Sequence, residues 1–330
     1  MISIDKDRIK KIFENFQNKK ILVLGDVMID EYLLGYVNRM SPEAPVPVIE
    51  IENELLKFGG AANVALNLKS LGCEPILTGL IGQDRMGDMF MELMRENDMD
   101  VNGIIRSGNR PTTVKTRIIG NNQHIARVDK EHREYVAGPV IKEIKQHIDE
   151  LLRGIDAIVI QDYNKGMLPV EIIEFALEIA KERNIITTVD PKFINFLSYK
   201  NTSVFKPNIK EAAQALARVI ETDDDVLAAG SELLKILNAG SILLTRGPKG
   251  LSLFEANGEI SHIPTRARKV ADVSGAGDTV ISTMTAALVG NASYKEAAYF
   301  ANSAAGIVCE EVGIVAIEKQ RLLNNILDSE

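Results

Sequence analysis

Short runs of apolar residues alternate along this chain with segments of helical spacing, and this alternation constrains the fold more than any other feature. The strand-like runs are residues 21–25, 75–81, 157–161, 185–190, 203–206 and 241–245. The helical segments are residues 61–71, 86–96, 169–183, 209–218, 226–237, 276–289 and 295–310. Continuous apolar strands that alternate with helices indicate a parallel sheet covered on both faces. We therefore expect a doubly wound α/β fold with a mostly parallel sheet.

Two stretches break this alternation. Residues 31–57 contain three prolines and extended sequence, and residues 110–128 are rich in Thr, Val and Ile. Such sequence is typical of antiparallel strands outside the main sheet. A small β-sheet lid, inserted as segments of approximately 31–57 and 103–130, explains both stretches, and edge hairpins on the main sheet are the alternative. Because we find no repeat and no linker, we expect a single domain over residues 1–330.

Composition and charge exclude several classes of protein. Of the 330 residues, 45% are hydrophobic and 25% charged, as in folded globular proteins. The formal charge of −8 disfavours nucleic acid as a partner, since nucleic-acid-binding proteins usually present a basic face. Two cysteines are too few for a disulfide scaffold, no apolar run could span a membrane, and the charged N-terminus lacks the apolar stretch of a signal peptide. We therefore expect a cytoplasmic protein without a membrane partner.

The strongest chemical signal precedes the helical segment 276–289 and reads Asp272-Val-Ser-Gly-Ala-Gly-Asp278. Small residues at a helix start let backbone N–H groups point at an anion, and the helix dipole favours negative charge there. In phosphoryl transfer, Asp278 would take a hydroxyl proton. The amides of Gly275, Ala276 and Gly277 would hold the charge that develops on the phosphoryl group. An ordinary helix N-cap is the alternative.

A second glycine-rich segment, Gly59-Gly-Ala-Ala-Asn63, also opens a helix. Its glycines allow a ligand to approach the backbone, and the Asn63 amide offers a donor and an acceptor to sugar hydroxyls. Helix packing is the alternative for these glycines. Asp26 and Asp30 follow the first strand at its carboxyl end, where open α/β sheets bind ligands. Either would contact sugar hydroxyls or serve as a turn residue.

Polar clusters follow four more strands at the same end, at residues 162–166, 190–192, 206–211 and 245–250. Asn208 and Glu211 stand three apart in a first helical turn, so both can face one hydrated Mg²⁺. Gly247 and Gly250 would form a flat turn against a nucleotide base. The chain has no P-loop, no dinucleotide-binding glycine motif and no zinc-ligand spacing.

The segments 59–63 and 272–278 resemble the two signatures of the ribokinase-like (PfkB) carbohydrate kinases. The similarity extends from residue 21 to about residue 317. It implies a doubly wound α/β/α domain with a small β-sheet lid, and an ATP- and Mg²⁺-dependent transfer of a phosphoryl group to a sugar hydroxyl.

The resemblance also implies roles for individual residues. Asp278 matches the catalytic base, and Gly275, Ala276 and Gly277 match the anion hole. The positions expected to bind ATP are Asn208, Glu211, Thr245, Gly247, Gly250 and Asn302, of which Asn208 and Glu211 match the motif that tunes Mg²⁺. The positions expected to contact sugar hydroxyls are Asp30, Gly59, Gly60, Asn63 and Asp162. A monovalent cation such as K⁺ is expected at Asp272, Ser274 and Gly313, although Val312-Gly-Ile-Val replaces the more usual pattern there.

Within the family, three strings are most similar to kinases of D-glycero-β-D-manno-heptose 7-phosphate. They begin at Gly25, Arg39 and Asp162 and read GDVMIDEY, RMSPEAPVPV and DYNKG. They imply phosphorylation of the C1 hydroxyl to give heptose 1,7-bisphosphate, for ADP-heptose and lipopolysaccharide core biosynthesis. Candidate cations for the substrate phosphate are Arg39, Lys115, Arg117, Arg127, Lys165 and Lys192. A kinase for another sugar or sugar phosphate and a non-catalytic sugar-nucleotide sensor are the alternatives.

The resemblance carries two further expectations. Relatives often form homodimers through their lids, and the apolar lid residues Val46, Val48, Ile49 and Ile51 would suit such contact. Some heptose kinases carry a fused nucleotidyltransferase, which we do not expect within these 330 residues. Adenylyl transfer would then fall to a separate protein.

Overall fold

The computed structural model describes residues 4–265 and 270–328. Within them, the strands of the main sheet are β1 (Lys20–Gly25), β4 (Glu74–Gly82), β5 (Ile104–Ser107), β8 (Ala157–Gln161), β9 (Ile186–Asp190), β10 (Val204–Phe205), β11 (Ser241–Thr245), β12 (Leu251–Glu255) and β13 (Ile260–Ile263). Their order is β13-β12-β11-β10-β9-β8-β1-β4-β5. From β11 to β5 the strands run parallel, and β12 and β13 add an antiparallel edge. The predicted mostly parallel sheet is therefore confirmed.

Helices cover both faces of this sheet. One face is covered by α1 (Lys6–Asn15), α2 (Ala61–Leu71), α3 (Arg85–Glu96), α8 (Ala276–Val289), α9 (Tyr294–Val308) and α10 (Lys319–Leu327). The other is covered by α4 (Pro139–Leu151), α5 (Val170–Glu182), α6 (Ile209–Ala215) and α7 (Asp223–Leu237). Successive residues of β1 serve both cores, since Val23 packs on one side and Leu22 and Leu24 on the other. The doubly wound arrangement is therefore confirmed.

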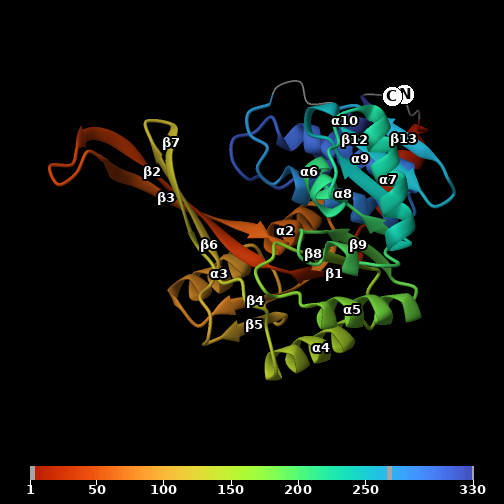
Figure 1. The fold of residues 1–330 in the computed structure, drawn as a ribbon, viewed down its shortest axis with the longest axis horizontal. Coiled ribbons are helices and arrows are strands. Elements are labelled where there is room, and N and C mark those ends of the chain that lie inside the picture. Colours follow the sequence, from red (N-terminus) through yellow and green to blue (C-terminus); the bar gives the residue numbers. More distant parts are fainter. Residues whose placement is uncertain (1–3, 266–269, 329–330) are drawn as a thin grey trace.

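A second sheet projects away from the α/β body (Figure 1). Its strands are β2 (Val27–Met40), β3 (Pro47–Gly60), β6 (Val114–Gly120) and β7 (Gln123–Lys130), in the order β3-β2-β6-β7. We call this sheet the lid. Two expectations need correction. Residues 104–107 were expected in the lid but form β5, because Ile104 and Ile105 are buried against the main sheet. In addition, β2 and β6 pair in parallel, so the lid is only partly antiparallel.

Helix α8 is fixed deep in the molecule. All its residues from Asp278 to Val289 are buried, and it packs between α2 and α9. Its first turn therefore has a fixed position near the carboxyl ends of β8, β9 and β10, where Asp162, Asp190 and Lys206 follow the strands. None of the helices described is long and apolar enough to cross a membrane.

Candidate active site

Asp278 is held by three side-chain donors. Its carboxylate, 3% exposed, accepts hydrogen bonds from Asn63 Nδ2 (2.8 Å), Tyr163 Oη (2.9 Å) and Gln161 Nε2 (3.1 Å). The N-cap of α8 is Gly275, with φ of +80° and no side-chain cap, so the alternative interpretation of this segment as an ordinary helix N-cap is wrong. Burial raises the pKa of Asp278 to about 7, because the loss of water disfavours the charged carboxylate. Such a group can accept a proton near neutral pH.

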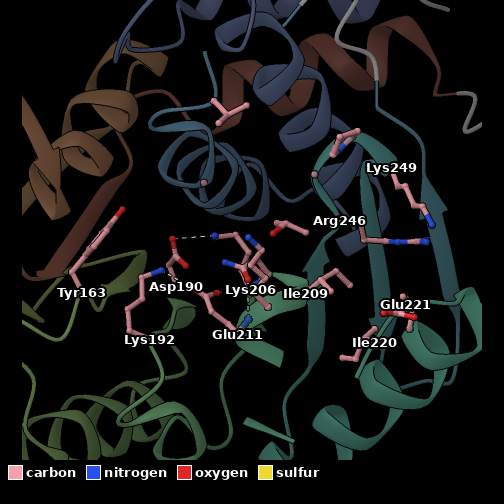
Figure 2. A pocket seen from close by; sticks show the side chains of 18 residues that line it. Tyr163, Asp190, Lys192, Lys206, Ile209, Glu211, Ile220, Glu221, Arg246 and Lys249 are labelled. Atoms are coloured by element: carbon pink, nitrogen blue, oxygen red, sulfur yellow. Dashed lines mark hydrogen bonds and ion pairs between the residues drawn. The ribbon is translucent and has the colours of Figure 1, made fainter. Parts of the chain in front are cut away.

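A buried polar chain connects Asp278 to a lysine. Gln161 Nε2 also donates to Asp190 Oδ2 (2.9 Å). Lys206 Nζ lies 2.9 Å from the same oxygen (Figure 2). All three side chains are buried. Asp190 and Lys206 begin two of the polar clusters expected at this edge of the sheet, but neither was given a role, and Gln161 was not predicted. All three residues stand at or directly after the carboxyl end of a strand.

A cavity of about 720 Å³ opens beside this chain. Its wall includes Lys192, Lys206, Asn208, Glu211, Arg246 and Gly277 (Figure 2). A space of this size accommodates a drug-sized or cofactor-sized ligand. With the start of α8 on its wall, the cavity suits a polyanion.

A smaller cavity of about 240 Å³ adjoins the larger one. The two share Thr245, Gly247 and Gly277, and the smaller has Leu251 and Val280 in its apolar wall. Gly250 and Asn302 also line it, as expected for ATP-binding positions. The side-chain amide of Asn302 already makes a hydrogen bond within the protein, in which its Nδ2 donates to the carbonyl of Pro264 (2.7 Å). An apolar slot beside a cationic cavity matches the two ends of a nucleotide.

Asn208 and Glu211 form a capping box at the start of α6. Asn208 Oδ1 accepts from the Glu211 amide and Glu211 Oε2 from the Asn208 amide, both at 2.9 Å. Glu211 Oε1 binds Lys192, whose ammonium also lies 5.2 Å from the centre of the Tyr163 ring. Within residues 4–265 and 270–328, no three His, Cys, Asp or Glu side chains could together hold a metal ion. The oxygens of Asn208 and Glu211 are donors of the kind that fit a hydrated Mg²⁺.

The two glycines of the first signature are required sterically. A Cβ on Gly59 would lie 2.3 Å from Asp30 Oδ2. Gly60 has φ of +59°, and a Cβ there would lie 2.4 Å from the carbonyl oxygen of Asp26. Asp26 itself is structural, because its carboxylate accepts from three backbone amides of residues 163–167. The glycines therefore let the backbone approach Asp30 and Asp26 closely.

The lid sheet places three candidate cations on one face. Asp30 is in register with Lys115, Lys115 with Asp129, and Arg117 with Arg127. Neighbours across strands, and residues two apart on a strand, share a face. Each cation is paired with a carboxylate: Arg117 with Asp30, and both Lys115 and Arg127 with Asp129 at 3.0 Å. Burial raises the pKa of Asp30, although the Arg117 charge opposes this effect.

Glu131 is surrounded by cations from the lid and the body. Its carboxylate lies 2.6 Å from Lys165 Nζ, 2.6 Å from an Arg133 nitrogen and 3.6 Å from Lys115 Nζ. The side chain is 11% exposed. Glu131 and Arg133 were not predicted, since no motif marks them. Three cations around one anionic group form a geometry that a phosphate could also occupy.

Two predicted substrate contacts are not in the site. Asp162 is 1% exposed, and its oxygens accept from the Asn164 amide (2.8 Å) and the Tyr199 hydroxyl (2.7 Å). Its carboxylate thus points into the core, and the prediction is wrong. Arg39 is exposed near the far end of β2, nine residues beyond Asp30. At about 3.3 Å per residue it lies roughly 30 Å along the strand, so this chain does not bring it to Asp278.

The predicted monovalent-cation positions do lie together. Asp272 Oδ1 accepts from the Ser274 amide (2.9 Å), and Asp272 Oδ2 from the Gly313 amide (3.1 Å). These bonds lower the pKa of Asp272 against the effect of burial. A cation at this place remains a prediction.

The sequence profile of the pfkB family carbohydrate kinases matches residues 18–320. This chain therefore belongs to the pfkB family of carbohydrate kinases. Similar curated relatives include the bifunctional protein HldE of Trichlorobacter lovleyi, 36% identical over 320 residues, and that of Helicobacter pylori strain J99, 38% identical over 309 residues. These alignments cover 97% and 93% of this chain but 65% and 66% of the relatives, so the chain spans about two thirds of their length.

Solved structures share the ribokinase-like fold. Arabidopsis thaliana ribokinase, complexed with ribose and ATP, superimposes with a TM-score of 0.73 at 18% identity, over 94% of this chain and 99% of that one. Escherichia coli phosphofructokinase-2, in complex with substrates and products, gives a TM-score of 0.78 at 18% identity, over 95% and 100%. At this identity the likeness establishes the fold. Family and fold together make the protein a phosphotransferase with a sugar hydroxyl as acceptor.

Proposed function

We propose that this chain transfers the γ-phosphoryl group of ATP to the C1 hydroxyl of D-glycero-β-D-manno-heptose 7-phosphate. The product would be heptose 1,7-bisphosphate, used for ADP-heptose and the lipopolysaccharide core. The observation that carries the kinase chemistry is the buried Asp278 carboxylate, with its raised pKa, beside the uncapped start of α8. The motif resemblance to the heptose 7-phosphate kinases supplies the acceptor.

The chemistry requires one proton acceptor and one set of anion donors. Asp278 takes the proton of the acceptor hydroxyl as its oxygen attacks the γ-phosphorus. The bond from that phosphorus to the bridging oxygen breaks, and its electron pair leaves with ADP. The backbone amides of Gly275, Ala276 and Gly277 donate to the phosphoryl oxygens. In this structure Tyr163 Oη donates a hydrogen bond to Asp278 Oδ1. The acceptor hydroxyl of the sugar would take the place of the Tyr163 hydroxyl at that oxygen.

ATP fits across the two cavities, with its base in the apolar slot lined by Gly250 and Asn302 and its phosphates in the cationic cavity. Lys192 lines the cationic cavity, so we assign it to the nucleotide side. Mg²⁺, held by Asn208 and Glu211 through water, would neutralise phosphate charge.

The substrate phosphate fits at the cations around Glu131. Lys115 lies on the lid and Lys165 on the body, so a phosphate between them would join the two parts. The Glu131 carboxylate occupies that position in this structure and would have to move. Arg117 and Arg127 lie on the same lid face as Lys115 and would extend the positive field over the sugar.

The lid is also the proposed homodimer interface. Val46 and Ile51 are 51% and 40% exposed, while Val48 and Ile49 are half-buried. Exposed apolar side chains on a projecting sheet favour association with a second copy. A monomeric mass by light scattering at micromolar concentration would contradict this interface.

The test is an assay of ADP release with ATP, Mg²⁺ and a panel of heptose 7-phosphate, unphosphorylated heptose, fructose 6-phosphate and ribose. We expect a kcat/KM for heptose 7-phosphate at least about 100-fold above those for unphosphorylated heptose and ribose, since hydrogen bonds to a charged phosphate are worth about 1.5–3 kcal/mol each. Fructose 6-phosphate keeps a phosphate and therefore tests the sugar itself, and we expect it to react more slowly than heptose 7-phosphate. Phosphorus NMR should show the new phosphate at C1. Equal turnover of ribose or fructose 6-phosphate would refute the substrate, and tight binding without any turnover would favour the sensor alternative.

A further inference from the structure

We propose that Lys206 is a catalytic residue, whose ammonium contacts the transferring phosphoryl group in the transition state. The inference rests on the proposed function for the reaction class and gives a role to a residue that had none among the predicted site residues. Lys206 directly follows β10 and is 4% exposed. Lysines are almost never buried to this extent without a partner. Its partner is Asp190, whose Oδ2 lies 2.9 Å from Lys206 Nζ.

The Lys206 ammonium lies close to the first turn of α8. A Cβ built on Gly277 would lie 3.5 Å from Lys206 Nζ and 3.8 Å from Asp190 Oδ2. Gly277 supplies one of the amides proposed to hold the phosphoryl group, and both residues line the cationic cavity. The ammonium therefore lies where a phosphoryl oxygen at the start of α8 would be within reach.

Two other cations of the cavity wall are bound to carboxylates, and Lys210 and Lys249 also line it. Lys192 is bound to Glu211 and Arg246 to Asp223. In Figure 2, Arg246 lies across the cavity from Asp190 and Lys206. Among the described residues of the cavity wall, Lys206 is the cation that shares a hydrogen-bonded chain with Asp278, through Asp190 and Gln161. Asp190 and Gln161 are thereby positioning residues, which fix the ammonium relative to the base.

The positive charge of the Lys206 ammonium suits a ligand whose negative charge is distributed over several oxygens. As the new oxygen–phosphorus bond forms and the bond to ADP breaks, charge is spread over the three non-bridging oxygens of the phosphoryl group. The acceptor proton goes to Asp278, and Lys206 keeps its protons and donates one hydrogen bond to a non-bridging oxygen. Because the ammonium is preorganised by Asp190 in a site shielded from water, it stabilises this charge without reorganising.

The first test compares Lys206→Met and Lys206→Arg with the control Lys235→Met, which removes an exposed lysine on α7. Removing one such donor lowers kcat by about 100- to 1,000-fold, so Lys206→Met should show that loss with KM values within about threefold of wild type. Lys206→Arg should recover at least about tenfold of it, because the charge is kept. A kcat for Lys206→Met within threefold of wild type would overturn the proposal, as would an equal loss in Lys235→Met.

A second experiment measures nucleotide binding and needs no sugar substrate. Calorimetry compares the Kd of ADP with and without aluminium fluoride, a mimic of the transferring phosphoryl group. Wild type should bind ADP more tightly with the fluoride, and Lys206→Met should lose at least about tenfold of that gain while its Kd for ADP alone stays unchanged. An unchanged gain would overturn the proposal even if the variant is less stable. A wrong heptose assignment would appear in the wild-type panel, whereas a wrong role for Lys206 appears only in the variants.

Discussion

The side-chain amide of Asn63 donates to Asp278 across 2.8 Å, although 215 positions separate the two residues in the chain. The bond joins the first signature segment, at the start of α2, to the second, at the start of α8. Asn63 is itself fixed by Asn67 Nδ2, which donates to its carbonyl oxygen at 2.9 Å. Packing of α2 on α8 thus sets the environment of the proposed base. Because the Asn63 donor affects the pKa of Asp278, the pH dependence of the reaction directly tests whether Asp278 is the base.

We expect kcat/KM to fall about tenfold per pH unit below a limb near pH 7, because only the charged Asp278 can accept a proton and burial raises its pKa to about 7. Asn63→Ala removes a donor that favours the charged form. Its acidic limb should therefore move to higher pH. A pH profile between 5 and 9 measures the acidic limbs of wild type and variant, and a wild-type kcat/KM that stays constant down to pH 5 would show that Asp278 is not the titrating base.

The unfolding free energy of Asp278→Asn should rise relative to that of wild type as the pH increases. The folded-state pKa of Asp278, about 7, lies above the ordinary value of 3.8, so the stability that the neutral acid confers is lost as the pH rises through about 7. Between pH 5 and pH 8 the unfolding free energy of the variant should gain up to about 3 kcal/mol on that of wild type. Urea unfolding at the two pH values measures this difference. A constant difference would mean that the native carboxyl group titrates normally.

Tyr163→Phe and Tyr199→Phe form a matched pair of hydroxyl deletions. The Tyr163 hydroxyl donates to Asp278, whereas the Tyr199 hydroxyl donates to Asp162, away from the cavities. Tyr163→Phe should move the acidic limb of kcat/KM to higher pH, and Tyr199→Phe should leave the limb in place. Tyr199→Phe should still lower the unfolding free energy by about 1–3 kcal/mol, because Asp162 loses a buried donor. Equal shifts of the limb in both variants would contradict the assigned geometry.

Lys165→Met should raise the KM for a phosphorylated sugar by about tenfold or more, because an ion-paired phosphate contact is worth about 1.5–3 kcal/mol. The KM for ATP should not change, since Lys165 lies at Glu131 and outside the nucleotide cavities. Lys200→Met, at an exposed lysine, is the control. Initial rates with varied sugar phosphate and varied ATP measure both constants. An equal rise in both KM values would remove Lys165 from the phosphate site.

The sequence predicted the fold well because its signals are local. Alternation of apolar residues located the buried strands, and β8, β11 and α8 have the expected bounds. Helices α1, α4 and α10 were not predicted. The prediction relied on helical segments that alternate with apolar strands, and these three helices are not part of that alternation. The strand β5 was placed in the lid, since four residues of sequence do not show which sheet they will join.

The site residues that could be predicted are those that belong to one continuous sequence motif. Gly275, Gly277 and Asp278 lie at the start of α8, as their motif predicted. The contact of Asn63 with Asp278 was not predicted, since Asn63 was expected only to meet sugar hydroxyls. Contacts between distant segments were missed, as in the chain from Lys206 through Asp190 and Gln161 to Asp278. Asp162 was misplaced because sequence shows that a carboxylate follows a strand but not whether it turns to the cavity or to Tyr199.

The most direct measurement of the central claim is the kcat of Asp278→Asn with ATP and the preferred sugar at pH 8, where the wild-type carboxylate is charged. Asparagine keeps the shape of the side chain and removes its capacity to take a proton. If Asp278 is the base, kcat should fall by about 100- to 10,000-fold while the variant remains folded. A kcat within a few-fold of wild type would contradict the account.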